Sequence, residues 1–336
     1  MATRADRSGD TSAARAVAEL RARGELWEPA PGLVALRGDA LALFRALERA
    51  VAEVATSAVR SVGGDEWLVS PAIPLATLER ARYFASFPQW LTLAAHLSDD
   101  PRALERVASS DRPAEAARAA LALADAALPP AVCYHVYAAL AGTTLRGARA
   151  VSAQCTCWRH EGERLRALER GWAFTMREAV CLGGDDDVGR FADDTGDRAA
   201  ALARALGLGG RFAEASDPFF APTARGRGLL QRIKALKHEL LLPLDDRGSG
   251  AEVAAASVNR HEHFFGEAFD ILLPDGAPAA GACVAFGVER WLLAFLAAHG
   301  PHARGWPAVA GASARPATAD RRRPPEGSTP LVEIPR

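Results

Sequence analysis

The chain has 336 residues, of which 49% are hydrophobic, and its 40 lysines and arginines nearly balance its 41 aspartates and glutamates, for a formal net charge of −1. A chain of this length can bury one large core or two modest ones, and its balanced charge argues against a broad nucleic-acid surface. No apolar run approaches the roughly 18 residues of a membrane span, and the N-terminus lacks the apolar segment of a secretory signal.

The two ends of the chain are predicted to be disordered. Residues 1–12 are polar, and 312–336 are rich in Pro, Arg, Ser and Thr, so neither segment can bury a core. We expect a single domain over 13–311, whose first part, 13–74, is helical. The chain shows no P-loop and no GxGxxG motif, so a nucleotide would have to bind without a glycine-rich phosphate loop.

Helical patterns dominate the first third. Residues 39–62 carry apolar side chains at a spacing of three to four and end at Gly63 and Gly64, which is typical of a helix C-terminus. The segments 74–87 and 113–128 are predicted to be further helices.

Strand-like patterns begin after Pro129 and Pro130. Segments rich in β-branched and aromatic residues with partial alternation are predicted to be strands over 131–140, 148–161, 172–183, 229–244 and 252–273. A helix at about 187–206 interrupts them, and an apolar helix over 284–300 closes the domain. Because many strands are adjacent in sequence, the predicted fold class is α+β, with an antiparallel sheet flanked by helices.

The five cysteines are an odd number in a chain without export features, which favours reduced thiols or metal ligands in a cytoplasmic protein over disulfides. Cys155 and Cys157 precede Arg159 and Glu161 in the stretch SAQCTCWRHE, and on a strand these side chains share one face. A Cys-X-Cys pair can chelate a metal, but structural zinc sites use a wider gap and a second pair. We therefore interpret Cys155 and Cys157 as small core residues.

A second candidate metal set is scattered along the chain. Cys133, Glu178 and Cys283 lie in separate segments, and their spacing says nothing about a shared site. Together they would leave one position of a tetrahedral zinc open, as in substrate-binding sites, but each cysteine could also be buried filler. His261 and His263 could ligate a metal as well, although surface or hydrogen-bonded histidines are the preferred interpretation.

Two arginines lie beside apolar residues, Arg159 at a predicted strand end and Arg290 in the helix FGVERWLL. Burying a guanidinium without an anion is costly, and Glu289 could be the partner of Arg290, although adjacent residues on a helix point apart. A polyphosphate would satisfy both arginines, since the planar guanidinium matches phosphate oxygens. Structural ion pairs are the alternative.

Several motifs occur in the order CWRHE, RGWAFTMRE, SDPFF, IKALKHELLLP, ASVNRHEHFFG and GACVAFGVERW. With Cys133, Glu178 and Cys283 in place, this set resembles the amino acid:[carrier protein] ligases, relatives of the atypical zinc-dependent seryl-tRNA synthetases. The resemblance covers roughly 75–299. It implies a class II aminoacyl-tRNA synthetase-like fold, usually homodimeric. It also implies ATP-dependent activation of a small amino acid and its transfer to the phosphopantetheine of a carrier protein.

The resemblance further implies how ATP is bound. Arg159 is expected on the α-phosphate and Arg290 on the γ-phosphate, where both would act in catalysis. Glu161 is expected on the adenine amino group, and Phe174 should stack on the adenine ring. Further ATP contacts are expected at Arg170, Gly171 and Ser257.

The same resemblance assigns the metal and the substrate pocket. Cys133, Glu178 and Cys283 match the zinc ligands, and the substrate's amino group would take the fourth position, so that Glu178 also binds substrate. For Lys237 and Asp217 a solvated strand end or an Asp-Pro turn is an equal alternative. The pocket residues expected from the match are Glu239, with a catalytic role, Asn259, Lys237 and Asp217.

The chain departs from the family pattern in the charged, helix-prone segment 159–178, and at Gly171 and Trp172 within it. Mg²⁺ is expected with ATP, and Glu252 is the acid nearest to its expected position. Aminoacylation of tRNA is the alternative activity, which the lack of a basic arm disfavours, and a non-catalytic binding protein is another. We expect a cytoplasmic enzyme without a membrane or tRNA partner.

Overall fold

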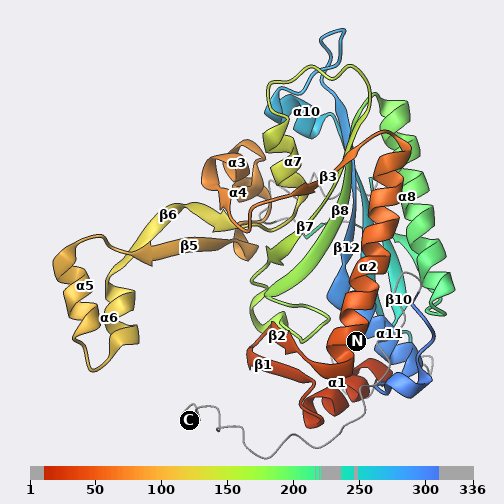
Figure 1. Cartoon of the computed structure of the whole chain (residues 1–336). Helices are drawn as coiled ribbons and strands as arrows, with labels where there is room; N and C mark the ends of the chain where they lie inside the picture. The colour runs from red at the N-terminus through yellow and green to blue at the C-terminus, as the bar shows by residue number, and fades with distance from the viewer. Residues whose placement is uncertain (1–10, 216, 219, 221–235, 246–248, 310–336) are drawn as a thin grey trace, which may run out of the picture.

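The computed structural model describes residues 11–309, apart from 216, 219, 221–235 and 246–248. A seven-stranded sheet forms its centre, in the order β3-β7-β8-β12-β11-β10-β9 (Figure 1). Strand β3 pairs in parallel with β7, and the other neighbours are antiparallel, so the predicted α+β class is confirmed. The strands are β3 (Asp65–Leu68), β7 (Arg149–Trp158), β8 (Ala173–Gly183), β9 (Arg211–Glu214), β10 (Lys237–Pro243), β11 (Glu252–Glu262) and β12 (Ala280–Gly287).

Strands β7 and β8 are neighbours in the sheet, and both lie in segments that the sequence predicts to be strands. Their register runs from Arg149 opposite Leu182 to Trp158 opposite Ala173. Strand β8 is buried from Met176 to Gly183, which places the carboxyl group of Glu178 in the interior. A buried carboxyl group needs a hydrogen-bond donor or a metal, because isolated burial is costly.

Long helices cover one face of the sheet: α2 (Gly38–Ser61), α8 (Asp185–Ala205) and α11 (Val288–His299) (Figure 1). The buried side chains of α2 include Leu43, Leu47 and Val51, which repeat every four residues and form one apolar stripe. Helix α1 (Ser12–Ala22) packs against α11. These helices enclose the larger core.

A second apolar cluster lies on the other face, under short helices. It joins Tyr137, Phe265 and Phe269 to Val180 and Leu182 of β8. The helices of this layer are α3 (Leu75–Arg80), α4 (Tyr83–Ser86), α7 (Cys133–Ala139) and α10 (Phe264–Phe269), with short 3₁₀ turns η2 (Pro88–Trp90), η3 (Gly162–Arg164) and η4 (Ala303–Gly305) elsewhere.

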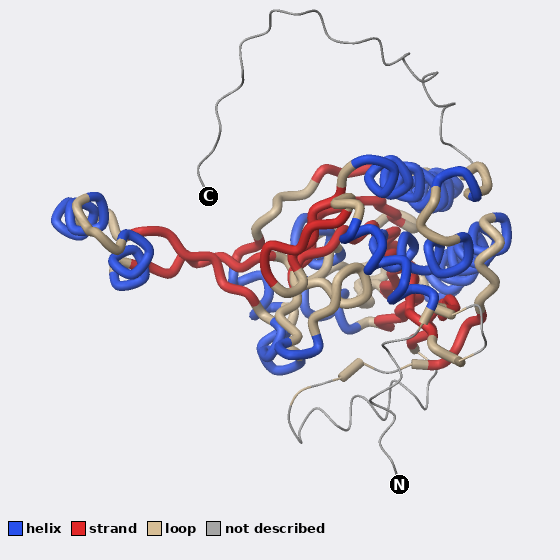
Figure 2. The backbone as a smooth tube through the Cα atoms, turned by 90° about the horizontal axis from the view of Figure 1, so that it is seen from below, coloured by secondary structure: helices blue, strands red, loops and turns tan. Residues whose placement is uncertain are grey.

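Two smaller sheets extend the body. The hairpin β1 (Leu26–Ala30) and β2 (Leu33–Leu36) lies near the N-terminus. The other sheet, β4 (Ile73–Pro74), β6 (Leu121–Leu128) and β5 (Thr92–Leu97), carries α5 (Pro101–Ala108) and α6 (Pro113–Ala119) at its far end. Strands β5 and β6 and their two helices project from the body as an arm in both views (Figures 1 and 2).

Several predicted elements are wrong in type. The segment 131–140 contains helix α7, whose buried Cys133, Tyr134, Val136 and Tyr137 follow helical spacing. The predicted helix 113–128 ends with α6 and continues as β6, because alternating side chains of LALADAAL pair with β5. Tertiary packing overrides residue propensity in both cases.

Other predictions fail at their boundaries. The strand over 252–273 ends at Glu262 and gives way to α10, and the helix over 284–300 begins only at Val288. The part 13–74 contains strands as well as helices. Helix α1 begins at Ser12, inside the segment expected to be disordered, and the hydroxyl of Thr11 caps it by accepting from the Ala14 amide. Residues 1–10 and 312–336 lie outside the described chain.

Within the described ranges, none of the helices combines the length and the apolar character needed to cross a bilayer.

Candidate active site

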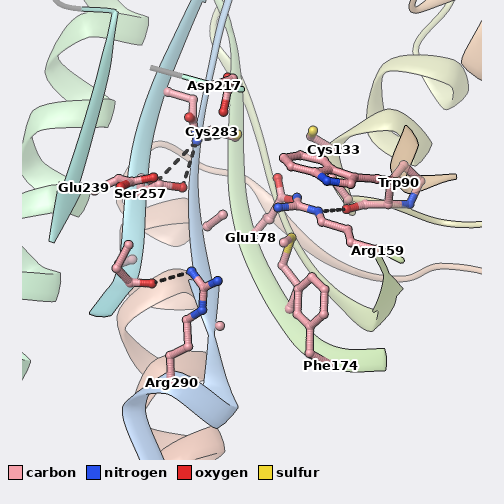
Figure 3. Close-up of a pocket in the computed structure, with 18 of the residues that line it drawn as sticks. Trp90, Cys133, Arg159, Phe174, Glu178, Asp217, Glu239, Ser257, Cys283 and Arg290 are labelled. Atoms are coloured by element: carbon pink, nitrogen blue, oxygen red, sulfur yellow. Dashed lines mark hydrogen bonds between the residues drawn. The ribbon is translucent and has the colours of Figure 1, made fainter. Parts of the chain in front are cut away.

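One cavity on the α7 face of the sheet brings together every residue predicted for the site (Figure 3). Three of these residues form a thiol cluster, and Arg159 and Arg290 form an arginine pair. The view of Figure 3 shows Arg290 at one end, Cys133 and Cys283 at the other, and Arg159 between them. The predicted residues that line the cavity are Cys133, Arg159, Glu161, Arg170, Gly171, Phe174, Glu178, Asp217, Lys237, Glu239, Ser257, Asn259, Cys283 and Arg290.

The thiol cluster consists of Cys133, Glu178 and Cys283, whose donor atoms all lie within 4.8 Å of one another and are buried. Glu178 Oε1 accepts a hydrogen bond from the Val132 amide at 2.9 Å, whereas its buried Oε2 has no partner in the described chain. Burial raises the pKa of Glu178. Two thiols and an unsatisfied carboxyl oxygen are a donor set that fits Zn²⁺.

Three different elements bring these ligands together. Strands β8 and β12 are neighbours, with Cys283 opposite Val180 and Glu178 opposite Ala285, and Cys133 begins α7 above them. The pKa of the Cys133 thiol is raised, mainly by its hydrogen bond with Cys283 and secondly by burial. Because the three residues meet only through sheet pairing and helix placement, their sequence spacing carried no signal.

Further donors surround the sulfur of Cys283. His261 Nε2 lies 3.4 Å from Cys283 Sγ, and Asn259 Nδ2 lies 3.7 Å from it. Asn259 Nδ2 also donates to Ser257 Oγ at 3.1 Å. His263 instead contacts the Pro278 carbonyl at 3.0 Å, so the two histidines do not form a joint site.

The two arginines are half-buried in the cavity wall, yet neither forms an ion pair with a carboxylate of the described chain. Arg159 Nε donates to the Pro130 carbonyl at 2.9 Å, and its guanidinium carbon lies 5.7 Å from the Trp90 ring centre and 5.5 Å from that of Phe174. Cation–π attraction from these rings helps to hold a desolvated guanidinium. Its positive charge is left for an external anion.

Arg290 is anchored through backbone carbonyls. Its Nε donates to Glu169 O at 2.8 Å, and a terminal nitrogen donates to Ala254 O at 2.9 Å. Burial, and then the charges of Arg170 and Arg159, lower the pKa of Arg290. A polyphosphate would relieve this repulsion between cations.

Glu289 does not neutralise Arg290. Both of its carboxyl oxygens contact the Thr175 amide, at 2.8 and 2.9 Å, as expected for adjacent residues that diverge on a helix. Burial raises the pKa of Glu289 to about 7. This carboxyl group therefore ties α11 to β8 beneath the arginine pair.

The segment between β7 and β8 is organised by a different ion pair. Arg170 donates to Glu161 Oε2 at 2.6 Å. A side chain at Gly171 would place its Cβ 2.6 Å from the Ala173 carbonyl oxygen, so glycine is required there. Trp172 Nε1 donates to Thr92 Oγ1 at 3.0 Å. The two departures from the family pattern thus have local structural reasons.

A polar wall faces the cavity from the other side. Lys237 Nζ lies 2.6 Å from Asp217 Oδ1 and 3.1 Å from Glu239 Oε1. Lys237 and Asp217 are therefore a bonded pair on the cavity wall rather than a solvated strand end and an isolated turn. Glu252, by contrast, pairs with Arg211 and lines a separate cavity, so its position gives no support to a magnesium role.

The Cys155 and Cys157 pair lies outside the thiol cluster. Their sulfurs are 3.7 Å apart, and Cys157 is fully buried with Val132, Ala153 and Met176, while Cys155 packs against the same group. This arrangement agrees with their interpretation as core residues.

Sequence reasoning missed the aromatic wall of the cavity, which is formed by Tyr83, Phe87, Trp90 and Tyr134. Phe87 and Trp90 stack with ring centres 5.4 Å apart, and Trp90 also faces Arg159. The aromatic residues of the stretch YFASFPQW were the available signal, of which Tyr83 and Phe87 lie in the segment predicted only to be a helix.

No protein-family model matches the chain. It is 35% identical over 269 residues to amino acid–[acyl-carrier-protein] ligase 1 of Bradyrhizobium diazoefficiens, covering 80% of this chain and 81% of that one. It is 26% identical to the type-2 serine–tRNA ligase of Methanococcus maripaludis, of which it spans 53%.

Among solved structures, Methanopyrus kandleri SerRS in complex with A. aeolicus tRNASec superimposes with a TM-score of 0.75 at 23% identity, over 92% of this chain and 60% of that one. The sheet and its flanking helices therefore have the predicted class II aminoacyl-tRNA synthetase fold.

Proposed function

The chain belongs to the amino acid–[acyl-carrier-protein] ligase family, and on that premise we propose that it activates a small amino acid with ATP and transfers it to the phosphopantetheine thiol of a carrier protein. The observation that carries the proposal is a single cavity that holds a convergent Cys, Glu and Cys set and two half-buried arginines without a carboxylate partner in the described chain. A polyphosphate and an amine would complete these two groups.

The first step is attack of the amino acid's carboxylate on the α-phosphorus of ATP, with pyrophosphate leaving. Negative charge increases on the phosphate oxygens in the transition state, where a preorganised guanidinium stabilises it. We assign Arg159 to the α-phosphate and Arg290 to the γ-phosphate. Phe174 would stack on adenine, and Glu161 would accept from its amino group.

The seat of the nucleotide includes further residues of the same cavity. Arg170 holds Glu161 in place through their 2.6 Å bond, and the close backbone approach at Gly171 shapes the segment that carries both. Ser257 is assigned to ATP contacts from β11. Mg²⁺ is proposed to accompany ATP, without an assigned protein ligand.

Cys133, Glu178 and Cys283 would hold Zn²⁺, consistent with the unsatisfied buried oxygen of Glu178. When bound there, zinc offers a Lewis-acidic position to a free amine, which favours amino acids over plain carboxylic acids. We assign Asn259, Lys237 and Asp217 to the walls that orient the substrate. Glu239 is assigned a catalytic role beside them.

The second step is attack of the phosphopantetheine thiol on the acyl carbon. A carbon–sulfur bond forms, the carbon–oxygen bond to AMP breaks with its electron pair on AMP, and the thiol proton is released. This step calls mainly for positioning, because the adenylate is already a reactive acyl donor.

We also propose that 13–311 act as one catalytic domain in a cytoplasmic homodimer without a tRNA partner. The edge strand β3 supports a second copy, since its far side is free of strands in the described chain and Leu68 is 98% exposed. Light scattering of the purified chain at several concentrations tests the dimer, and a monomer throughout would contradict it.

Pyrophosphate exchange with a panel of amino acids tests the first step, and no exchange with any amino acid would favour a non-catalytic binding protein. The likeness to type-2 serine–tRNA ligases keeps tRNA aminoacylation as the alternative. Parallel reactions with a phosphopantetheinylated carrier protein and with total tRNA separate the two. We expect a mass shift on the carrier and none on tRNA.

A further inference from the structure

His261 occupies an unusual place for a histidine. It lies on β11, where its half-buried ring sits beside Cys283 of the neighbouring strand β12, and its Nε2 is 3.4 Å from the sulfur. The ring packs edge-on against Phe265, with centres 4.8 Å apart, and against Tyr137 at 6.0 Å. Two aromatic contacts thus fix the direction in which Nε2 points.

The geometry separates His261 from the ligands themselves. The donor atoms that lie within 4.8 Å of one another belong to Cys133, Glu178 and Cys283, and the ring nitrogens of His261 are not among them. If His261 were a fourth ligand, a tetrahedral site would be closed and no position would remain for an amine. Because His261 lies beside the three ligands and is not one of them, the fourth position of a tetrahedral zinc stays open.

The direction of the hydrogen bond follows from the acceptor. A metal-bound cysteine is a thiolate, which can only accept, so Nε2 must carry the proton. The neutral tautomer of the ring with its one proton on Nε2 meets this requirement.

The two thiolates are treated differently by their surroundings. Cys283 faces two nitrogen donors, His261 and Asn259, whereas Cys133 receives no side-chain N–H in the described part of the chain. Two thiolates and a carboxylate outweigh the charge of a divalent zinc, which weakens its attraction for an amine. An N–H donor to one thiolate withdraws part of the negative charge on its sulfur and fixes the orientation of that sulfur.

We propose that His261 is a positioning residue that donates Nε2–H to the Cys283 thiolate, orients it as a zinc ligand and keeps the amine-binding position open. This inference rests on the proposed zinc site. Comparable hydrogen-bond partners around metal ligands alter metal affinity by roughly 10- to 100-fold when they are removed, and we expect a loss in that range.

The test compares zinc affinity, measured by competition with a chromophoric chelator, in four variants of the full chain. His261→Leu removes the donor, His261→Phe removes it but keeps an aromatic ring against Tyr137 and Phe265, and His261→Gln restores an amide N–H near Nε2. His263→Leu, two residues further along, is the matched control. We expect weaker zinc binding in the Leu and Phe variants at position 261 and near-normal binding in the Gln variant and the control.

A second measurement reports on the metal–sulfur bond and does not depend on the stability of the fold. In the cobalt-substituted chain, loss of the N–H donor should shift the thiolate-to-metal charge-transfer band, and His261→Gln should restore it. Equal affinity and unchanged bands in all variants would overturn this inference alone. A cobalt spectrum with a histidine nitrogen in the coordination shell would overturn it in favour of a fourth ligand. A wild-type chain that binds no zinc would overturn the proposed zinc site as well.

Discussion

The thiol cluster and the arginine pair lie in one cavity but are built in opposite ways. Cys133, Glu178 and Cys283 converge on one point and leave a carboxyl oxygen without a partner in the described chain. Arg159 and Arg290 stand apart, each fixed through backbone carbonyls and neither paired with a described carboxylate. The first group is suited to a cation and the second to an anion, which in the proposed reaction would be Zn²⁺ and the phosphates of ATP.

The strongest way to separate the two groups is to remove a thiol. Cys133→Ala should reduce bound zinc from one equivalent to nearly none, because two remaining ligands cannot hold it. ATP affinity should change little, since the arginine pair is untouched. Metal analysis and calorimetric titration with ATP measure the two effects, and full zinc retention would contradict the assignment.

Removing an arginine should give the converse result. Arg159→Ala should slow pyrophosphate exchange by about 10²- to 10³-fold, the usual effect of losing one preorganised donor to a developing charge, while zinc content stays normal. Arg112→Ala, on the exposed arm, is the control. An exchange rate within a few-fold of wild type would remove Arg159 from the reaction.

Glu289, beneath the arginine pair, can be tested through the pH dependence of the free energy of unfolding. Its pKa rises from 4.5 to about 7 on folding, so the folded chain holds a proton that the unfolded chain has lost. The stabilisation is complete below pH 4.5 and disappears as the pH rises through 7, with a total on the order of 3 kcal/mol.

Urea unfolding from pH 4.5 to 8 should therefore show a fall in the wild type that is flatter in Glu289→Gln. Identical slopes in the two proteins would contradict the raised pKa.

The smallest expected effect belongs to the other cysteine pair. Cys157→Ala removes one buried sulfur and should cost stability of about 1 kcal/mol from the small cavity, without changing zinc content. The contrast with Cys133→Ala is measured by the same metal analysis. Zinc loss in the Cys157 variant would move the metal site to the conspicuous Cys-X-Cys.

The sequence predicts the parts of the fold whose local pattern agrees with their packing. Strands β7 and β8 and helices α2 and α8 fall close to their expected ranges, since β-branched and aromatic residues suit the two strands and four-residue apolar repeats match the face that α2 buries. Helix α7 and strand β6 were misassigned, because aromatic residues of α7 pack at helical spacing and the alanines of β6 are held by β5. In α7 and β6, packing against neighbouring elements decides the secondary structure.

The candidate site divides in a similar way. The residues assigned by the resemblance all line one cavity of the structure. Residue chemistry alone could not join Cys133, Glu178 and Cys283, because they meet through sheet register and a helix start. Trp90 and its aromatic neighbours were missed, because they precede the recognisable motifs. The hydrogen bond of His261 depends on the pairing of β11 with β12, which no spacing encodes.

Strand β12 and the start of α11 connect the two groups directly. Cys283 lies on the strand and Arg290 in the first turn of the helix that follows it, and the four steps from Cys283 to Gly287 span about 13 Å of extended chain. Losing one residue from this segment would shorten it by about 3.3 Å and turn Cys283 to the opposite face. The length of CVAFGVER therefore sets the distance between the thiol cluster and the arginine pair.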